Sequence, residues 1–213
     1  MNVKTMGRVL KGTAGRASEK FEGKASEQVV GRAELKLKEA VKAFSYDFRG
    51  KVVLDIGSST GGFTELALRL GASRVVAVEK GTKQMKAPLR YDTRIELHEK
   101  TDVFTITNKD ISVPDVILAD VSFVSLTKIL QHAKQCIAGK NTDYLAMLKP
   151  QFEAYPDQLV NGVVKNEKMR REIIKRFEQW LARNGFRIVK KRDNAVRGKI
   201  GGNQERFYWL KAV

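Results

Sequence analysis

The fold is decided by the stretch Val52-Val53-Leu54-Asp55-Ile56-Gly57-Ser58-Ser59-Thr60-Gly61-Gly62-Phe63-Thr64. A short apolar run ends in an acid, breaks into a loop of Gly, Ser and Thr, and is followed at once by a helical pattern. This order predicts a strand, a tight turn and a helix N-terminus, which together hold a nucleotide-like ligand at the carboxyl edge of a parallel sheet. The stretch contains neither the Gly-Lys-Ser/Thr of a P-loop nor the G-x-G-x-x-G of a dinucleotide site.

What stands there instead is D-x-G-x-x-x-G-G, which resembles the S-adenosylmethionine (SAM) loop of class I methyltransferases. The resemblance implies that SAM binds here, with Asp55 pairing with its ammonium group. A second acid, Glu79, ends the next apolar run and is expected to accept hydrogen bonds from ribose hydroxyls. Asp102 is a candidate contact for the adenine amino group. The remaining expected cofactor-binding residues form the loop itself: Gly57, Ser58, Ser59, Thr60, Gly61, Gly62 and Phe63. The alternative is an ordinary strand-turn-helix without a ligand.

The composition points to a polyanionic partner. The chain has 213 residues, a net charge of +16 and an isoelectric point of about 10.0, with Lys and Arg spread along its length. A protein this basic is expected to meet nucleic acid, the alternatives being a solvated lysine-rich surface or attraction to anionic lipid. No apolar stretch could span a bilayer and no signal-peptide pattern opens the chain. A single cysteine, Cys136, fits a reducing cytoplasm, and two histidines with one cysteine argue against a structural zinc site.

Strand and helix patterns alternate from residue 31 onward, which predicts an α/β domain over 31–213. We expect a Rossmann-like, mostly parallel seven-stranded sheet with helices on both faces. Residues 1–30 are expected to form a basic, partly disordered arm. The expected strands are 51–56, 74–79, 94–98, 114–120, 143–149, 186–191 and 206–211. Helices are expected from Arg32 to about Phe44 and at 61–70, 81–89, 125–138 and 166–184, with Gly71 and Gly185 as helix stops. The long connection from Pro150 to Asn166 is a candidate lid or binding loop.

The residues at the predicted strand ends restrict the nucleophile that such a cofactor would methylate. Methylation of cytosine C5 needs an attacking cysteine, and Cys136 lies in a helical pattern away from the strand ends. Methylation of base amino groups typically uses an Asn/Asp-Pro-Pro-Tyr loop, which is absent. Instead, Asp120 and Lys149 close two strands, where parallel sheets place ligands and chemistry.

The chain resembles the TlyA or hemolysin A-like family, within the FtsJ-like class of ribosomal RNA 2′-O-methyltransferases. Five strings carry the resemblance: SSTGGFT, DVSFVSL, LKPQFE, NGVVKN and GGNQER. The resemblance implies a catalytic tetrad formed by Lys36, Asp120, Lys149 and Glu205. A ribose 2′-hydroxyl needs a base, and a lysine can serve when a second cation and partial desolvation lower its pKa. Lys149 is the expected base, Lys36 the neighbouring cation, Asp120 the residue orienting Lys149, and Glu205 a positioning residue. No metal is required.

The chain departs from the family pattern in two places. Residues 1–30 lack the pattern of a complete alpha-L RNA-binding domain, and the family's S-R-G-x-L-K-L reads Gly31 to Leu37 as GRAELKL. The resemblance implies SAM-dependent ribose methylation of ribosomal RNA at cytidines, with ribosomal RNA or subunits as partner. A catalytically weak ribosome-binding or assembly protein of the same fold is the alternative. A small-molecule O-methyltransferase is disfavoured by the charge, and a membrane-lytic protein by the lack of a suitable apolar segment.

Overall fold

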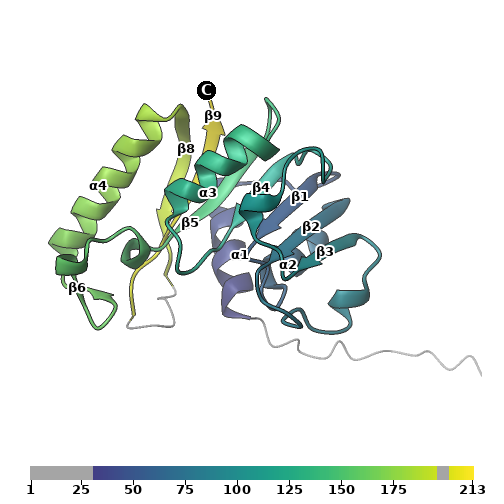
Figure 1. Ribbon diagram of the computed structural model, residues 1–213, viewed down its shortest axis with the longest axis horizontal. Helices are drawn as coiled ribbons and strands as arrows, with labels where there is room; N and C mark the ends of the chain where they lie inside the picture. Colours follow the sequence, from purple (N-terminus) through teal and green to yellow (C-terminus); the bar gives the residue numbers. More distant parts are fainter. Residues whose placement is uncertain (1–30, 196–201) are drawn as a thin grey trace, which may run out of the picture.

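The computed structural model describes residues 31–195 and 202–213, so the expected arm at 1–30 lies outside the described residues. Its main feature is a seven-stranded sheet with the order β3-β2-β1-β4-β5-β9-β8 (Figure 1). The strands are β1 Val52–Ile56, β2 Arg74–Glu79, β3 Ile95–Glu99, β4 Val116–Ala119, β5 Asp143–Leu148, β8 Phe186–Asp193 and β9 Arg206–Ala212. Neighbouring strands are parallel except that β9 runs antiparallel to both β5 and β8. The predicted mostly parallel sheet is confirmed, with each strand within two residues of its expected ends.

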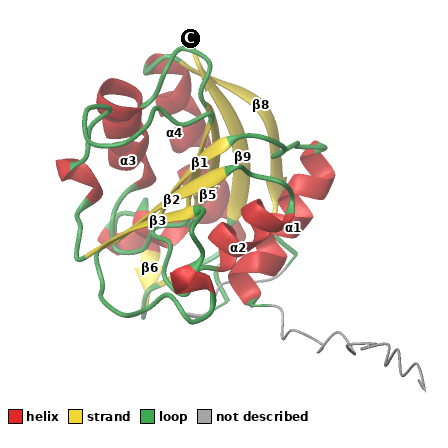
Figure 2. Cartoon of the chain, turned by 90° about the vertical axis from the view of Figure 1, so that its right-hand side faces the viewer, coloured by secondary structure: helices red, strands yellow, loops and turns green. Residues whose placement is uncertain are grey.

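Helices cover both faces of the sheet, as predicted (Figure 2). The α-helices are α1 Arg32–Phe44, α2 Gly62–Arg69, α3 Leu126–His132 and α4 Glu167–Arg183, and a π-helical turn, η3 Ala133–Ile137, continues α3. Gly71 and Gly185 follow α2 and α4 with φ of 96° and 69°, the left-handed conformation that ends a helix. Short 3₁₀ helices are η1 Leu89–Tyr91, η2 Val103–Thr105, η4 Pro150–Phe152 and η5 Pro156–Gln158. No helix within 31–195 and 202–213 is long and apolar enough to cross a membrane.

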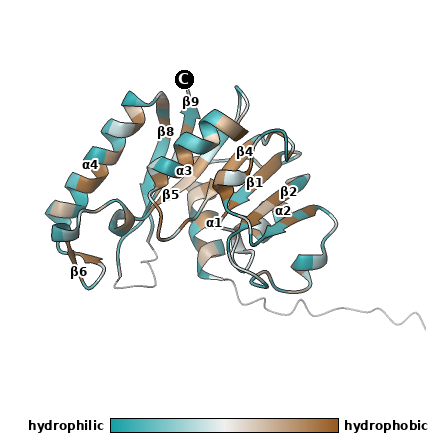
Figure 3. Cartoon of the chain, in the orientation of Figure 1, coloured by the Kyte–Doolittle hydropathy of each residue, from teal (hydrophilic) through white to brown (hydrophobic). Residues whose placement is uncertain are grey.

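The core consists of two layers separated by the sheet, because alternate strand residues point to opposite faces. In β1, Leu54 and Ile56 join the layer beneath α3 and α4, whereas Val53 joins the layer beneath α1 and α2. Figure 3 shows the hydrophobic colours concentrated on the central strands, with polar colours alternating along α4. Burial on both faces explains why the central strands read as continuous apolar runs.

One predicted helix, at 81–89, is wrong. The segment is a series of turns that becomes helical only at η1, and Lys83 has a φ of 54°. The backbone N–H groups that would begin a helix are used elsewhere: Gly81 donates to Glu79 at 2.7 Å and Gln84 donates to Glu99 at 3.2 Å. Pro88 also lacks the N–H group that a helix interior needs. Two strand-end carboxylates therefore hold this segment as a loop.

The connection from Pro150 to Asn166, expected as a lid or binding loop, contains short helices and a hairpin. It holds η4, η5 and a two-stranded antiparallel hairpin of β6 Leu159–Val160 and β7 Val163–Val164. The hairpin is fastened by the Asn203 side chain, which accepts from Val164 N at 3.0 Å and donates to Gly162 O at 3.1 Å. The connection is thus tied to the segment that precedes β9.

Candidate active site

Two adjoining cavities open at the carboxyl ends of β1, β2 and β4. The larger has a volume of about 710 Å³ and the smaller about 170 Å³, and both are bordered by Gly57, Ser59, Asp120 and Ser122. Glu79, Lys80, Gln84, Asp102 and Phe104 line only the larger cavity. Lys149, together with Ala33 of α1, lines only the smaller one. The expected cofactor loop therefore separates a roomy chamber from a narrow one that reaches the expected base.

The loop after β1 lies close to neighbouring segments at three glycine positions, where a side chain would not fit without a shift. Gly57 has a φ of 81°, and a Cβ built there would lie 2.8 Å from the Asp120 carbonyl oxygen. A Cβ at Gly61, where φ is 95°, would meet the Leu89 side chain at 2.3 Å. At Gly62 a Cβ would lie 3.2 Å from Glu34 N, where α1 packs on the start of α2. The glycines thus permit close approach of protein backbone as well as of a ligand.

We expect Gly57→Ala to lower the free energy of unfolding by about 2–4 kcal/mol, because it adds a backbone clash to the cost of a positive φ. Gly50→Ala is the matched control: its φ is 72°, but a Cβ there has nothing within 4 Å. The control should lose only about 1 kcal/mol. Urea denaturation measures both. Equal losses in the two variants would contradict the claim that the missing Cβ makes room for the Asp120 backbone.

Asp55 is completely buried below this loop and lines neither cavity. Its Oδ2 accepts a hydrogen bond of 2.6 Å from the Thr64 hydroxyl, while Oδ1 has no hydrogen-bond partner. Burial raises the pKa of Asp55 to about 7, an effect opposed by the Thr64 hydrogen bond and reinforced by the charge of Asp120. Asp55 therefore lies behind the cavity wall, and its pairing with the ammonium group of the cofactor stays a prediction. Its charge still lies immediately beneath the loop.

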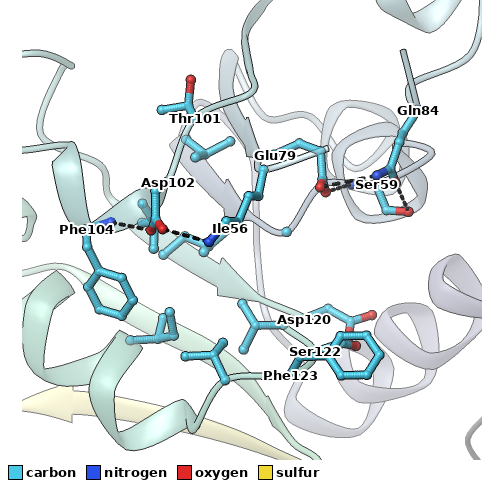
Figure 4. A pocket seen from close by; sticks show the side chains of 17 residues that line it. Ile56, Ser59, Glu79, Gln84, Thr101, Asp102, Phe104, Asp120, Ser122 and Phe123 are labelled. Carbon is cyan, nitrogen blue, oxygen red and sulfur yellow. Dashed lines mark hydrogen bonds and ion pairs between the residues drawn. The ribbon is translucent and has the colours of Figure 1, made fainter. Parts of the chain in front are cut away.

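Glu79 stands on the wall of the larger cavity and holds two loops together (Figure 4). Its carboxylate accepts from Ser59 N at 2.9 Å and from Gly81 N at 2.7 Å. Asp102 lies further along the same wall, where it pairs with Lys80 at 3.0 Å and accepts from Phe104 N at 3.2 Å. Those two hydrogen bonds lower the pKa of Asp102, which keeps it ionised at neutral pH. Both expected cofactor acids are thus in place on one wall.

In the smaller cavity, Lys149 is held between two groups of the segment after β4. Its Nζ pairs with Asp120 Oδ1 at 2.6 Å and donates to Ser122 Oγ at 2.8 Å. The Lys149 side chain is only 12% exposed, so its amine is positioned rather than freely solvated. The pairing of Lys149 with Asp120 is the arrangement expected for a base and its orienting acid. Ser122 is a further partner that the sequence reading did not single out.

Lys36 and Glu205 form the other half of the expected tetrad. Lys36 Nζ lies 2.5 Å from Glu205 Oε2, and the two side chains are 9% and 4% exposed. β5 and β9 pair with Leu148 opposite Arg206, so Lys149 and Glu205 lie just beyond the last pair at the same end of the sheet. The four expected catalytic residues are therefore arranged as two ion pairs at one edge, although Lys36 comes from α1.

Phe123 and Glu153 are two features of this edge that the sequence reading missed. Phe123 lines the larger cavity, is 84% exposed and has a φ of 64°, a rare conformation for an aromatic residue. Its ring lies 5.3 Å from that of Phe152. Glu153 accepts from Ser125 Oγ at 2.7 Å and from Leu126 N at 2.6 Å, at the start of α3. The strings DVSF and LKPQFE contain these residues, and their positions after two strand ends were the available signal.

The loop residues expected to bind the cofactor fall into two groups. The smaller cavity is lined by Gly57, Ser58, Ser59, Thr60, Gly62 and Phe63, whereas Gly61 lines neither cavity. Ser58 Oγ is buried and, like Asp55 Oδ1, lacks a hydrogen-bond partner. Buried polar atoms of this kind are normally satisfied, so the loop has unused capacity for a polar ligand. This fits SAM, which brings an ammonium, a carboxylate and ribose hydroxyls. Within the described part of the chain, no group of three or more His, Cys, Asp or Glu could hold a metal ion.

The strand order, the glycine loop after β1 and the acid that ends β2 together define a Rossmann-like methyltransferase of class I. The family model described as FtsJ-like methyltransferase matches residues 29–211, and the chain belongs to this family.

The chain is also similar to three individual proteins. It is 37% identical over 158 residues to YqxC of Bacillus subtilis, named as a candidate rRNA methyltransferase, and the match covers 73% of this chain but only 56% of YqxC. It is 35% identical over 182 residues to the 16S/23S rRNA (cytidine-2′-O)-methyltransferase TlyA of Mycobacterium tuberculosis, covering 84% of this chain and 67% of TlyA. A crystal structure of a candidate hemolysin from Lactococcus lactis matches with a TM-score of 0.80 and 36% identity, covering 85% of this chain and 87% of that one.

Proposed function

We propose that this protein transfers a methyl group from SAM to the 2′-hydroxyl of a ribose in ribosomal RNA. The observation that carries the proposal is the Lys149 amine, held by Asp120 and Ser122 at the wall of a cavity that adjoins the cofactor chamber. The names of the relatives, one of which is a ribosomal RNA cytidine-2′-O-methyltransferase, support the same substrate and a cytidine target. Ribosomal RNA as the substrate implies that the protein works in the cytoplasm.

In the proposed mechanism, the loop after β1, Glu79 and Asp102 would hold SAM, which would supply the electrophilic methyl group. Lys149 Nζ would accept the proton of the ribose hydroxyl as its oxygen bonds to the methyl carbon and the carbon–sulfur bond breaks, which releases SAH. Asp120 holds Nζ in place and stabilises the ammonium ion that results. The buried ion pair of Lys36 and Glu205 lies at the same edge and positions the acceptor ribose. The exposed ring of Phe123 offers a surface on which a nucleobase can stack.

Transfer of label from methyl-labelled SAM to purified ribosomal RNA and to ribosomal subunits tests this proposal. We expect labelled RNA from the wild-type protein and none when small hydroxylated acceptors replace the RNA. A protein that binds S-adenosylhomocysteine (SAH) but labels neither free RNA nor either subunit would instead be a binding or assembly protein of this fold.

The affinity for RNA should depend steeply on salt, because a chain of charge +16 binds phosphates mainly by releasing counterions. We expect the logarithm of the association constant to fall with the logarithm of the salt concentration, by about 0.7–0.9 for each phosphate neutralised. Titrations of labelled ribosomal RNA at four or more salt concentrations give the slope. A slope near zero would contradict binding led by phosphate contacts.

A further inference from the structure

The outer face of α4 has a row of cations that the folded chain does not use. The inner face is formed by buried apolar residues, among them Ile173, Ile174 and Phe177. Lys168, Arg171 and Lys175 are exposed, and their spacing of three and four residues places them together on one face of the helix. Glu172 and Gln179 are exposed beside them. We call Lys168, Arg171 and Lys175 the α4 stripe.

The side chains of the stripe differ in their contacts from Arg170 and Arg176 of the same helix, which have partners within the chain. Arg170 pairs with Glu167 and Asp193, and Arg176 donates to the Glu153 carbonyl and lies 4.2 Å from the centre of the Tyr155 ring. Within the described residues, no salt bridge, hydrogen bond or ring contact involves a side chain of the α4 stripe. These three cations are therefore left for a partner, as is Arg183 at the far end of the helix.

Local electrostatics around the stripe are mixed, because Glu167 lies four residues before Arg171 and Glu172 lies four residues after Lys168. Like charges at spacings of three and four residues destabilise a helix by about 0.2–0.5 kcal/mol per pair. Lys168 also lies in the first turn, where the positive end of the helix dipole disfavours a cation. Lys165, just before the helix, adds a further exposed positive charge.

The stripe is anchored to the catalytic edge. Arg176 is bonded to the Glu153 carbonyl, four residues after Lys149, and Arg170 Nε donates to the Gln204 carbonyl, next to Glu205, at 3.1 Å. The helix therefore contacts the segment that follows Lys149 and the residue that precedes Glu205. Figure 1 shows the start of α4 beside the β6 hairpin, at the end of the sheet away from the C-terminus. From Lys168 to Lys175 the helix rises about 10 Å, enough to face successive phosphates of one strand.

We propose that the α4 stripe binds the phosphate backbone of the RNA beside its methylated nucleotide and so sets the register of the strand at Lys149. The inference rests on the proposed function, since it assumes that RNA is the substrate. Phosphate contacts of this kind orient a nucleic acid without reading its sequence. The stripe should therefore govern affinity and placement while leaving the cofactor chamber unaffected.

The test compares two variants with the same change in charge. One replaces the stripe by Lys168→Glu, Arg171→Glu and Lys175→Glu. The control replaces three exposed cations near the opposite end of the sheet by Lys140→Glu, Arg183→Glu and Arg187→Glu. The probes are purified 16S and 23S ribosomal RNA, with SAH affinity and thermal unfolding as checks on folding. We expect the stripe variant to bind RNA about tenfold more weakly than the control, and its salt slope to fall by about 2.

Each outcome separates the two proposals. A wild-type protein that methylates ribosomal RNA, with the stripe variant and control equally weakened, would overturn the stripe and leave the proposed function intact. A wild-type protein that binds SAH but neither binds nor methylates the RNA would overturn both. A folded stripe variant with the larger loss of RNA affinity and unchanged SAH affinity supports the stripe.

Discussion

Lys149→Ala should lower the rate of methyl transfer about 1,000-fold or more, because a positioned general base contributes roughly 10²–10⁴-fold. Lys149 lines the smaller cavity and is bonded to Asp120 and Ser122, whereas the larger chamber is formed by other residues. SAH affinity should therefore change by less than about threefold, since the effect appears in the transition state. Single-turnover transfer to ribosomal subunits, together with calorimetric titration of SAH, measures the two quantities separately.

Lys149→Arg is the matched control for charge. A guanidinium preserves a cation beside Asp120, but it cannot act as a base near neutral pH. If proton removal is the role of Lys149, this variant should be nearly as slow as Lys149→Ala. Near-normal transfer by Lys149→Ala would remove this residue from the mechanism, and recovery by Lys149→Arg would assign it an electrostatic role only.

Asp55→Asn should weaken SAH binding roughly 30-fold or more, corresponding to about 2 kcal/mol, because it removes a buried negative charge beneath the cofactor loop. Burial raises the pKa of Asp55 to about 7, so the empty protein holds this carboxyl partly protonated at neutral pH. A ligand with an ammonium group binds the ionised form better. Wild-type affinity should therefore rise about tenfold between pH 6 and pH 8, whereas the affinity of Asp55→Asn should not change with pH. Calorimetric titrations at these pH values test both statements.

The raised pKa of Asp55 also makes the free energy of unfolding depend on pH. The folded protein binds the Asp55 proton more tightly than the unfolded chain, where the pKa is 3.8, so the free energy of unfolding falls as the pH rises from about 4 to about 7. The full effect is on the order of 4 kcal/mol. Thr64→Val removes the hydroxyl that bonds to Asp55 and should raise the pKa of that carboxyl further, so the rise of SAH affinity with pH should move to higher pH. A pH dependence of SAH affinity that is the same in Thr64→Val and the wild type would contradict the role given to the Asp55 charge.

The positions of the strands and their mostly parallel pairing follow from patterns that are local in the sequence. Each strand is a short run such as Val52–Ile56 that is apolar on both faces, and alternation with helices restricts the connections to a mostly parallel sheet. The helix ends at Gly71 and Gly185 were predictable for the same reason, since only glycine adopts a positive φ there at low cost. These features required no knowledge of distant contacts.

The failures come from contacts between distant segments. The residues from Gly81 to Gln84 have a plausible helical pattern, but their backbone N–H groups are captured by Glu79 and Glu99, and the second lies fifteen residues beyond Gln84. Gly57 was predicted as a cofactor-binding residue, and the structure adds that a Cβ there would lie 2.8 Å from the Asp120 carbonyl oxygen. No pattern within the loop could indicate either partner.

The candidate site was predicted as a set of residues but not as an arrangement. Motif positions identified Lys36, Asp120, Lys149 and Glu205 and gave Asp120 as the residue orienting Lys149, whereas the ion pair of Lys36 with Glu205 comes from the fold. The burial of Asp55 away from the cavity wall could not be read from its position at a strand end. The α4 stripe also escaped the sequence reading, because exposed and bonded cations alternate along the same helix.

The central claim is that the acceptor is a ribose oxygen of ribosomal RNA. Ribosomal RNA labelled by the wild-type protein with methyl-labelled SAM should be digested to nucleosides and separated, and the same RNA should be mapped for resistance to alkaline cleavage. We predict that the label elutes with a 2′-O-methylated nucleoside and that one protected linkage appears, which is absent from RNA treated with Lys149→Ala. Label on a base or on protein, with every linkage still cleaved by alkali, would contradict the account.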